Sequence, residues 1–142
     1  IGTGPEKKKL INLSRRLNLE DNITFFGFIE DYKDAVSILL SSKIGILTTV
    51  AGGKGNVVIS ELFAAELPVI AIGSDDGIDR RYIQESINGY ITDNISSEEL
   101  ADLMIKICKD EEKLFRMKSK LSNEKYKLDW SFSLQNHPAL NI

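Results

Sequence analysis

The residues best suited to binding a ligand lie between Gly52 and Glu61. The segment from Gly52 to Asn56 has little side-chain bulk, and an apolar run with one acid, Glu61, follows it. Glycines ahead of a helix let backbone N–H groups approach an anion closely, and the helix dipole favours negative charge there. Lys54 adds a positive charge, and the Glu61 carboxylate can accept hydrogen bonds from hydroxyl groups. A phosphate beside hydroxyl groups is typical of a nucleotide or a sugar nucleotide.

Two plainer interpretations apply to the same residues. The segment 52–56 can be a flexible turn between a strand and a helix, and Glu61 can be a solvated helix carboxylate. Binding is favoured because the segment follows a predicted buried strand, and ligands of open α/β sheets bind beyond the carboxyl ends of the strands. Val58, Leu62 and Ala65 flank Glu61 on its own face of the helix. We therefore expect this carboxylate to point toward the sheet, where it needs hydrogen bonds.

The elements that must position these residues alternate between strand-like apolar runs and helical patterns. Such alternation is typical of a parallel sheet covered by helices. Ile44, Ile46 and Leu47 are nearly continuous, as in a strand buried on both faces. We expect strands at 23–26, 43–49, 68–72 and 90–92, and helices that begin at Pro5, span 33–41, follow Asn56, lie near 80–85, follow Ser96 or Ser97, and begin at Glu111.

Apolar stripes predict which faces of three helices are buried. Residues three, four and seven positions apart share one face of a helix. Ser96 or Ser97 is expected to cap the helix that follows it, which has acidic residues in its first turn. The three stripes are Leu10, Leu13 and Leu17; Val36, Leu39 and Leu40; and Leu100, Leu103, Met104 and Ile107.

The composition is that of an ordinary soluble globular chain. Of its 142 residues, 42% are hydrophobic and 27% are charged, and the net charge of −3 argues against a general nucleic-acid-binding function. No apolar run reaches the roughly 18 residues needed to span a bilayer. Cys108 is the single cysteine, so we expect a reducing compartment, the cytoplasm. One cysteine and one histidine cannot build a metal cluster, so we expect no metal site.

The first predicted helix is basic. A run of this kind usually forms a solvated face of a helix. The alternative is attraction to an anionic membrane surface, which would place the protein at the inner face of the membrane. The basic residues are Lys7, Lys8, Lys9, Arg15 and Arg16.

Four segments in register resemble the family-four retaining glycosyltransferases of the GT-B fold. The segment from Glu61 to Ala71 is similar to the family pattern Glu-Ala-x-Ala-x-Gly-x-Pro-Val-Ile-Ala, and three further segments agree in order and spacing. The resemblance covers the chain up to about Trp130 and implies a Rossmann-like parallel sheet flanked by helices, the C-terminal half of a GT-B fold. The further segments are Ile1–Pro5, Ile23–Ile29 and Asn88–Ile91.

The resemblance also implies a donor site. In the family, the glycine-rich loop holds a diphosphate, the acid corresponding to Glu61 holds the ribose hydroxyls, and the segment corresponding to 27–29 cradles the base. The alternative for that last segment is an aromatic strand end that fills the core. The implied donor-binding residues are Gly27, Phe28, Ile29, Gly53, Lys54, Gly55, Asn56, Val57 and Glu61, with Gly2 and Gly4 lining the cleft.

The chain departs from the family pattern at several of these positions. The family usually carries a first Glu, seven residues before the second, that contacts the transferred sugar; here the position is Gly53, or Gly52 if the loop holds an insertion. Glu66 replaces a turn glycine, and Arg81 stands where a Glu is common. These changes favour a nucleotide site over sugar contacts and catalytic competence.

The resulting expectation is one nucleotide-sugar-binding domain over residues 1–142, in which 130–142 is a tail that crosses to another domain. Ile1–Pro5 looks like the end of a strand, so we expect a first strand-helix unit to be missing. The complete enzyme would be a hexosyl-type glycosyltransferase that needs no cofactor and carries its acceptor site on an N-terminal domain. The isolated domain should be inactive. The alternatives are a sugar-nucleotide epimerase, a non-catalytic nucleotide-binding module, and a Rossmann-like phosphate-binding domain for another ligand.

Overall fold

The computed structural model describes residues 1–49, 56–73, 78, 80–93 and 96–123. The chain divides into two compact units, the first from Ile1 to Ile38 and the second from Leu39 onward. The predicted tail at 130–142 lies outside the described residues, as does any continuation of the last helix beyond 123.

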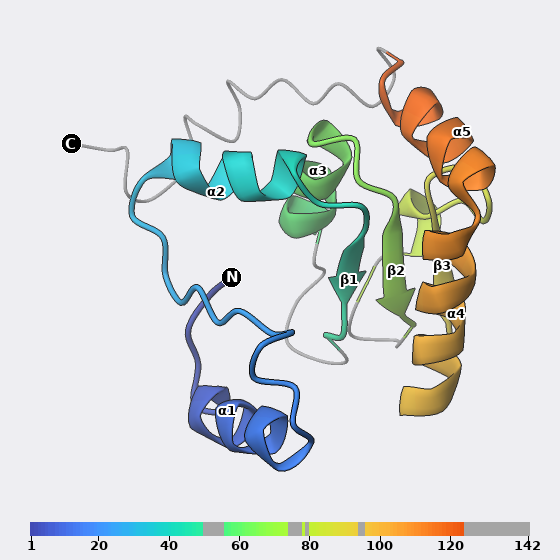
Figure 1. Cartoon of the computed structure of the whole chain (residues 1–142). Coiled ribbons are helices and arrows are strands. Elements are labelled where there is room, and N and C mark those ends of the chain that lie inside the picture. Colours follow the sequence, from blue (N-terminus) through green and yellow to red (C-terminus); the bar gives the residue numbers. More distant parts are fainter. Residues whose placement is uncertain (50–55, 74–77, 79, 94–95, 124–142) are drawn as a thin grey trace. The chain divides into compact units, whose positions relative to one another are not determined.

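The second unit is built on a parallel sheet (Figure 1). Within the described residues the sheet has three strands in the order β1-β2-β3, and Ile46, Ile70 and Tyr90 lie side by side in the register. Helix α3 connects β1 to β2. This arrangement confirms the predicted α/β class and is consistent with a Rossmann-like half of a GT-B fold. The bounds are β1 Gly45–Leu47, α3 Asn56–Ala64, β2 Val69–Ile72 and β3 Gly89–Thr92.

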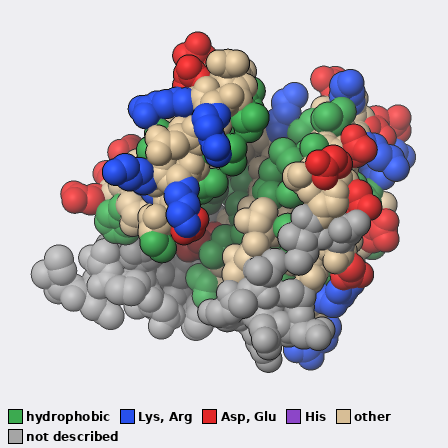
Figure 2. Space-filling view, turned by 90° about the horizontal axis from the view of Figure 1, so that it is seen from below, with side chains coloured by type: hydrophobic (Ala, Val, Ile, Leu, Met, Phe, Trp, Pro, Cys, Tyr) green, Lys and Arg blue, Asp and Glu red, His purple; other side chains and the backbone are tan. Residues whose placement is uncertain are grey.

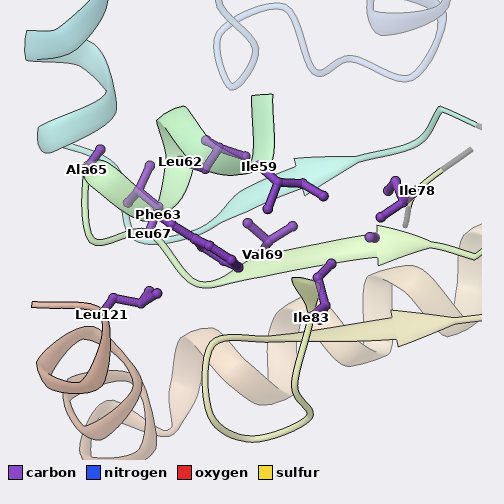
Figure 3. Packing of buried hydrophobic residues seen from close by; sticks show 10 residues of the cluster. Ile59, Leu62, Phe63, Ala65, Leu67, Val69, Ile78, Ile83 and Leu121 are labelled. Atoms are coloured by element: carbon purple, nitrogen blue, oxygen red, sulfur yellow. The ribbon is translucent and has the colours of Figure 1, made fainter. Parts of the chain in front are cut away.

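The central strand β2 is buried on both faces. Successive side chains of a strand point to opposite faces of the sheet. Val69 accordingly joins the cluster around α3, and Figure 3 shows Ile59 of α3 directed toward it. Ile70 joins a second cluster with Ile107 and Met117. Strand β2 thus holds the two layers of helices together, as expected for a strand that is apolar throughout.

Two consecutive helices cover the face of the sheet opposite α3. They are α4 (Ser97–Lys109) and α5 (Glu111–Leu121). Ser96 caps α4 as predicted, because its Oγ accepts a hydrogen bond from the Glu99 N–H at 3.4 Å. Asp110 ends α4 and caps α5, with its Oδ1 accepting from the Lys113 N–H at 2.9 Å. The predicted stripe on α4 is confirmed, since its members all pack in the second cluster: Leu100, Leu103, Met104 and Ile107.

A tight turn links α3 to β2. Glu66 has a φ of 58°, in the left-handed region that favours glycine. The Glu66 N–H donates to the Phe63 carbonyl and the Leu67 N–H to the Leu62 carbonyl, both at 2.9 Å. This pair of hydrogen bonds is the Schellman motif, which satisfies carbonyls at the end of a helix. Glu66 thus adopts the conformation that the glycine of the family pattern would adopt.

The first unit contains α1 (Lys7–Arg16) and an irregular segment after it. The helix begins two residues later than predicted, because Pro5 lies in a turn closed by a hydrogen bond from the Lys7 N–H to the Gly4 carbonyl at 3.1 Å. The predicted strand at 23–26 is wrong: these residues form no ladder. Next to this segment, the Gly2 N–H donates a hydrogen bond to the Gly27 carbonyl, and a single hydrogen bond does not make a sheet.

The predicted core stripe of α1 is also wrong. Leu10, Leu13 and Leu17 are exposed, and the helix buries Ser14, which is 5% exposed and donates from its Oγ to the Ile11 carbonyl at 2.8 Å. The reason is the missing ladder. Because residues 1–38 pair into no sheet, this unit has no sheet face that could cover the row of leucines.

The stripe predicted for the second helix is only partly correct. Helix α2 (Tyr32–Leu40) spans the boundary between the two units. Leu39 packs against the cluster around α3, but Leu40 is exposed. Residues 38–40 are consecutive apolar residues, and neighbouring residues of a helix cannot share one face.

Two further elements are shorter than predicted. The strand expected at 43–49 is β1 alone, and Ile46 is 38% exposed because β1 lies at an edge of the described sheet. The helix expected near 80–85 is a single 3-10 turn, η1 (Arg80–Tyr82). The buried Asn88 ends it: its side chain accepts from the Gln84 N–H at 2.7 Å and donates to the Tyr82 carbonyl at 3.0 Å. These bonds occupy backbone groups that a longer helix would need.

Candidate functional site

The carboxyl ends of the three strands meet at one edge of the sheet, as parallel strands must. Figure 2 looks onto this edge, toward which the arrows of Figure 1 point. Helix α3 follows β1 and therefore starts at the same edge. Ligands of open α/β sheets bind at this edge, so it is the natural place for the predicted site.

The glycine-rich loop is only partly covered by the structure. Gly53, Lys54 and Gly55 lie outside the described residues, and α3 begins at Asn56. Val57, in the first turn of α3, is exposed. The start of the helix is therefore where the sequence predicts it, while the cradle of N–H groups stays a prediction.

Glu61 lies in the second turn of α3, about 7.5 Å along the helix axis from its first residue. It is half-buried, and Val58, one turn before it, is exposed. Leu62 and Ala65 belong to the core cluster. The carboxylate thus lies at the border between the buried and the exposed faces of α3. The Glu61 carboxylate is therefore less exposed than a fully solvated one. Its role in binding the ribose stays a prediction.

The sequence did not predict an ion pair that lies at the edge of the sheet where the carboxyl ends of the strands meet. The two terminal guanidinium nitrogens of Arg80, Nη1 and Nη2, donate to the carboxylate of Asp93, and the bond from Nη2 to Oδ2 measures 3.1 Å. A Cβ built on Gly73 would lie 2.6 Å from Arg80 Nη1 and from Asp93 Oδ1, so the pair lies directly over this glycine. Gly73 and Asp93 follow the ends of β2 and β3. The one signal in the sequence is an acid immediately after a predicted strand.

The ion pair changes the acidity of Asp93. The hydrogen bond from Arg80 is the largest effect and lowers the pKa of this carboxyl group below its ordinary value. Loss of solvent acts in the opposite direction, and the positive charge of Arg80 adds a smaller lowering effect. Asp93 therefore stays ionised to lower pH than a free aspartate. The pair joins η1 to the end of β3 at this same edge of the sheet.

A second group of predicted residues comes together within the first unit. The Gly2 N–H donates to the Gly27 carbonyl at 2.6 Å, which joins the loop ahead of α1 to the segment predicted to hold the base. Gly27 is buried with a φ of 75°, a backbone conformation that favours glycine. Phe28 is 64% exposed, so it does not fill a core, and Ile29 is half-buried. Gly4 is exposed.

Two other kinds of site find no support in the described residues. No group of three or more His, Cys, Asp or Glu side chains lies close enough together to hold a metal ion in that part of the chain. None of the described helices is both long enough and apolar enough to cross a bilayer.

Comparison with known proteins supports the resemblance found in the sequence. Residues 1–125 match the family described as glycosyl transferases group 1. The chain is also similar to an uncharacterized glycosyltransferase of Haemophilus influenzae, with 28% identity over 131 residues. The match covers 91% of this chain but 36% of that relative, so the chain spans little more than a third of its length. Membership of this family implies a nucleotide-sugar donor. The chain belongs to the glycosyl transferases group 1, the retaining family four, as its four segments predict.

Proposed function

We propose that this chain is the donor-binding domain of a retaining glycosyltransferase. The enzyme transfers a hexose from a nucleoside-diphosphate sugar to a glycan or a lipid-linked acceptor, and the acceptor is held by an N-terminal domain. The observation that supports this most is the family match over residues 1–125. The parallel sheet, with α3 starting at the carboxyl edge of β1, supports it independently.

The diphosphate is held at the start of α3. In this proposal the diphosphate oxygens accept hydrogen bonds from backbone N–H groups of Gly53, Gly55, Asn56 and Val57, as the family resemblance implies, and Lys54 supplies a full positive charge. Hydrogen bonds and cations that are in place before the reaction stabilise the charge that develops on the departing diphosphate. The helix dipole adds to this stabilisation, since the positive end of α3 faces the ligand.

The nucleoside is held by two other groups of residues. Glu61, half-buried in the second turn of α3, accepts hydrogen bonds from the ribose hydroxyl groups. Gly27, Phe28 and Ile29 hold the base, with Gly2 and Gly4 lining the cleft. The hydrogen bond between Gly2 and Gly27 supports the placement of these two loops at one site.

Binding of nucleotides to the full-length protein tests the proposal. In titration calorimetry with UDP, GDP and ADP, at least one of them should bind saturably. Glu61→Gln should weaken that binding about 10- to 100-fold, the effect of losing hydrogen bonds to a charged group. The matched control is Glu111→Gln, an exposed acid in the first turn of α5. Absence of binding for every nucleotide, or equal affinities for the two variants, would contradict the proposal.

A non-catalytic nucleotide-binding module is the second candidate. It is favoured by one observation in the sequence, the glycine at 53 or 52 where the family carries a Glu that contacts the sugar. Product analysis with a panel of sugar nucleotides separates the possibilities. Transfer to an acceptor supports the transferase, and a change of sugar configuration without transfer identifies an epimerase. Nucleotide binding without any product from the full-length protein identifies the module. The isolated domain should show no activity, because the acceptor site belongs to the other domain.

The location of the protein follows from the same proposal. We place it in the cytoplasm, where nucleotide sugars are available, and at the inner membrane surface if the acceptor is lipid-linked. The exposed cations of α1 suit contact with anionic lipids, and Figure 2 shows basic side chains gathered over the first unit.

A further inference from the structure

We propose that Lys7 recognises the base of the donor nucleotide and selects bases with a keto oxygen, uracil or guanine, over their amino counterparts, cytosine and adenine. The proposal rests on the proposed function, because it requires the first unit to hold a nucleoside. It goes beyond that function by naming the residue that reads the base and the class of base that is preferred.

The position of Lys7 is set by two loops of the first unit. The hydrogen bond from the Gly2 N–H to the Gly27 carbonyl, at 2.6 Å, holds the two loops together. A Cβ built on Gly27 would lie 3.1 Å from Lys7 Nζ and 3.9 Å from Thr3 Cγ2. The ammonium group of Lys7 therefore rests over the backbone at Gly27, in space that a larger residue there would take.

This ammonium group has no hydrogen-bond or ion-pair partner among the described residues. Within residues 1–38, all of which the structure describes, Lys7 Nζ makes no hydrogen bond or ion pair, whereas Lys9 is bonded to Glu6 at 2.9 Å. Lys7 is also half-buried, while Lys8 and Lys9 are exposed. A partly buried charge without a partner costs free energy. An oxygen atom of a ligand would supply the missing partner.

The residues that flank Gly27 suit an aromatic ligand. Phe26 and Phe28 flank Gly27 in the sequence, and both are exposed although phenylalanine is usually buried. Exposed aromatic rings offer stacking surfaces for nucleobases, which contribute about 1–3 kcal/mol per base by alanine substitution. Lys7 Nζ lies over Gly27, the residue between these two phenylalanines, and from there it can contact the edge of a base that stacks on one of them.

The chemistry of lysine determines which bases it can read. An ammonium group has three donors and no acceptor. Guanine presents the O6 acceptor where adenine presents an amino group, and the pyrimidines differ in the same way, with a keto oxygen at O4 or an amino group at N4. Lys7 can therefore bond a keto oxygen, but it can only face an amino group donor to donor. The expected preference is for UDP over CDP, or for GDP over ADP.

Calorimetry on the full-length protein tests the preference with two matched ligand pairs, UDP with CDP and GDP with ADP. The wild-type protein should bind the keto member of at least one pair more tightly than its amino partner. Lys7→Met should reduce that preference about tenfold, as expected for one hydrogen bond from a charged group. It should do so by weakening the keto member alone. Lys8→Met removes the same charge from the neighbouring exposed position and should change neither pair.

Each other outcome would contradict either the role of Lys7 or the donor site itself. Equal weakening of all four nucleotides in Lys7→Met would mean that Lys7 contacts the phosphates and does not read the base. Unchanged affinities in Lys7→Met, with binding still lost in Glu61→Gln, would overturn the role of Lys7 and leave the donor site in place. Binding of no nucleotide by the wild-type protein would overturn the donor site itself. Circular dichroism of each variant shows whether the fold is kept.

Discussion

Glu66 occupies the helix-ending position that most often requires glycine. Its left-handed φ of 58° costs about 1–2 kcal/mol for a residue with a Cβ, and its side chain accepts a hydrogen bond from Ser122 Oγ. The strain and the hydrogen bond act in opposite directions on stability. The two effects can be separated by two variants, because Glu66→Ala removes the hydrogen bond alone and Glu66→Gly removes both.

We expect Glu66→Gly to be more stable than Glu66→Ala by about 1 kcal/mol in free energy of unfolding, because glycine has no Cβ to strain at this position. Urea denaturation measures the difference. Ser122→Ala is the control for the hydrogen bond and should be close to Glu66→Ala. A glycine variant no more stable than the alanine variant would show that this turn is not strained.

At the scale of elements, the Arg80–Asp93 pair joins η1 to the end of β3. Because the folded pKa of Asp93 lies below its ordinary value of 3.8, its contribution to stability is present above that value and is lost as the pH falls through the folded pKa. Both side chains are largely exposed, so added salt should weaken the pair.

Asp93→Asn should therefore lower the free energy of unfolding at neutral pH and leave it nearly unchanged at a pH below the folded pKa of Asp93. Urea denaturation at the two pH values measures this, with Asp102→Asn on the exposed face of α4 as the control. An equal loss of stability at both pH values would show that the carboxylate charge is not what matters.

At the scale of the whole molecule, the two units differ in how much they bury. All four residues of β2 are at most 5% exposed, whereas in the first unit the buried residues are Ser14 and Gly27. Local opening needs little free energy where few apolar contacts are lost. The sheet unit should therefore be the more stable part of the chain.

Hydrogen exchange should show this difference directly. The slowest amides should be those of Val69 to Ile72, which exchange only when the sheet unfolds, and the amides of α1 should exchange much faster through local opening. Mass spectrometry of peptides from the two units measures the rates. Equal protection of α1 and β2 would mean that the first unit is stabilised by contacts as extensive as those of the sheet.

What the sequence by itself determined is the local and periodic part of the fold. The apolar run of β2, the stripe on α4 and the cap at Ser96 depend on residues close together in the chain, so the spacing of residue types is enough to predict them. The family could also be predicted, because four segments agree in order and spacing. At the candidate site, the start of α3 and the partial burial of Glu61 could be anticipated in this way.

Only the tertiary structure decided the features that depend on distant segments. The hydrogen bond between Gly2 and Gly27 and the ion pair between Arg80 and Asp93 each join two loops, and loop positions follow no periodic rule. The leucines of α1 have the spacing of a core stripe but remain exposed, because a helix face is buried only where a partner surface exists. Segment 23–26 has the composition of a strand, but a strand needs a second chain segment to bond with.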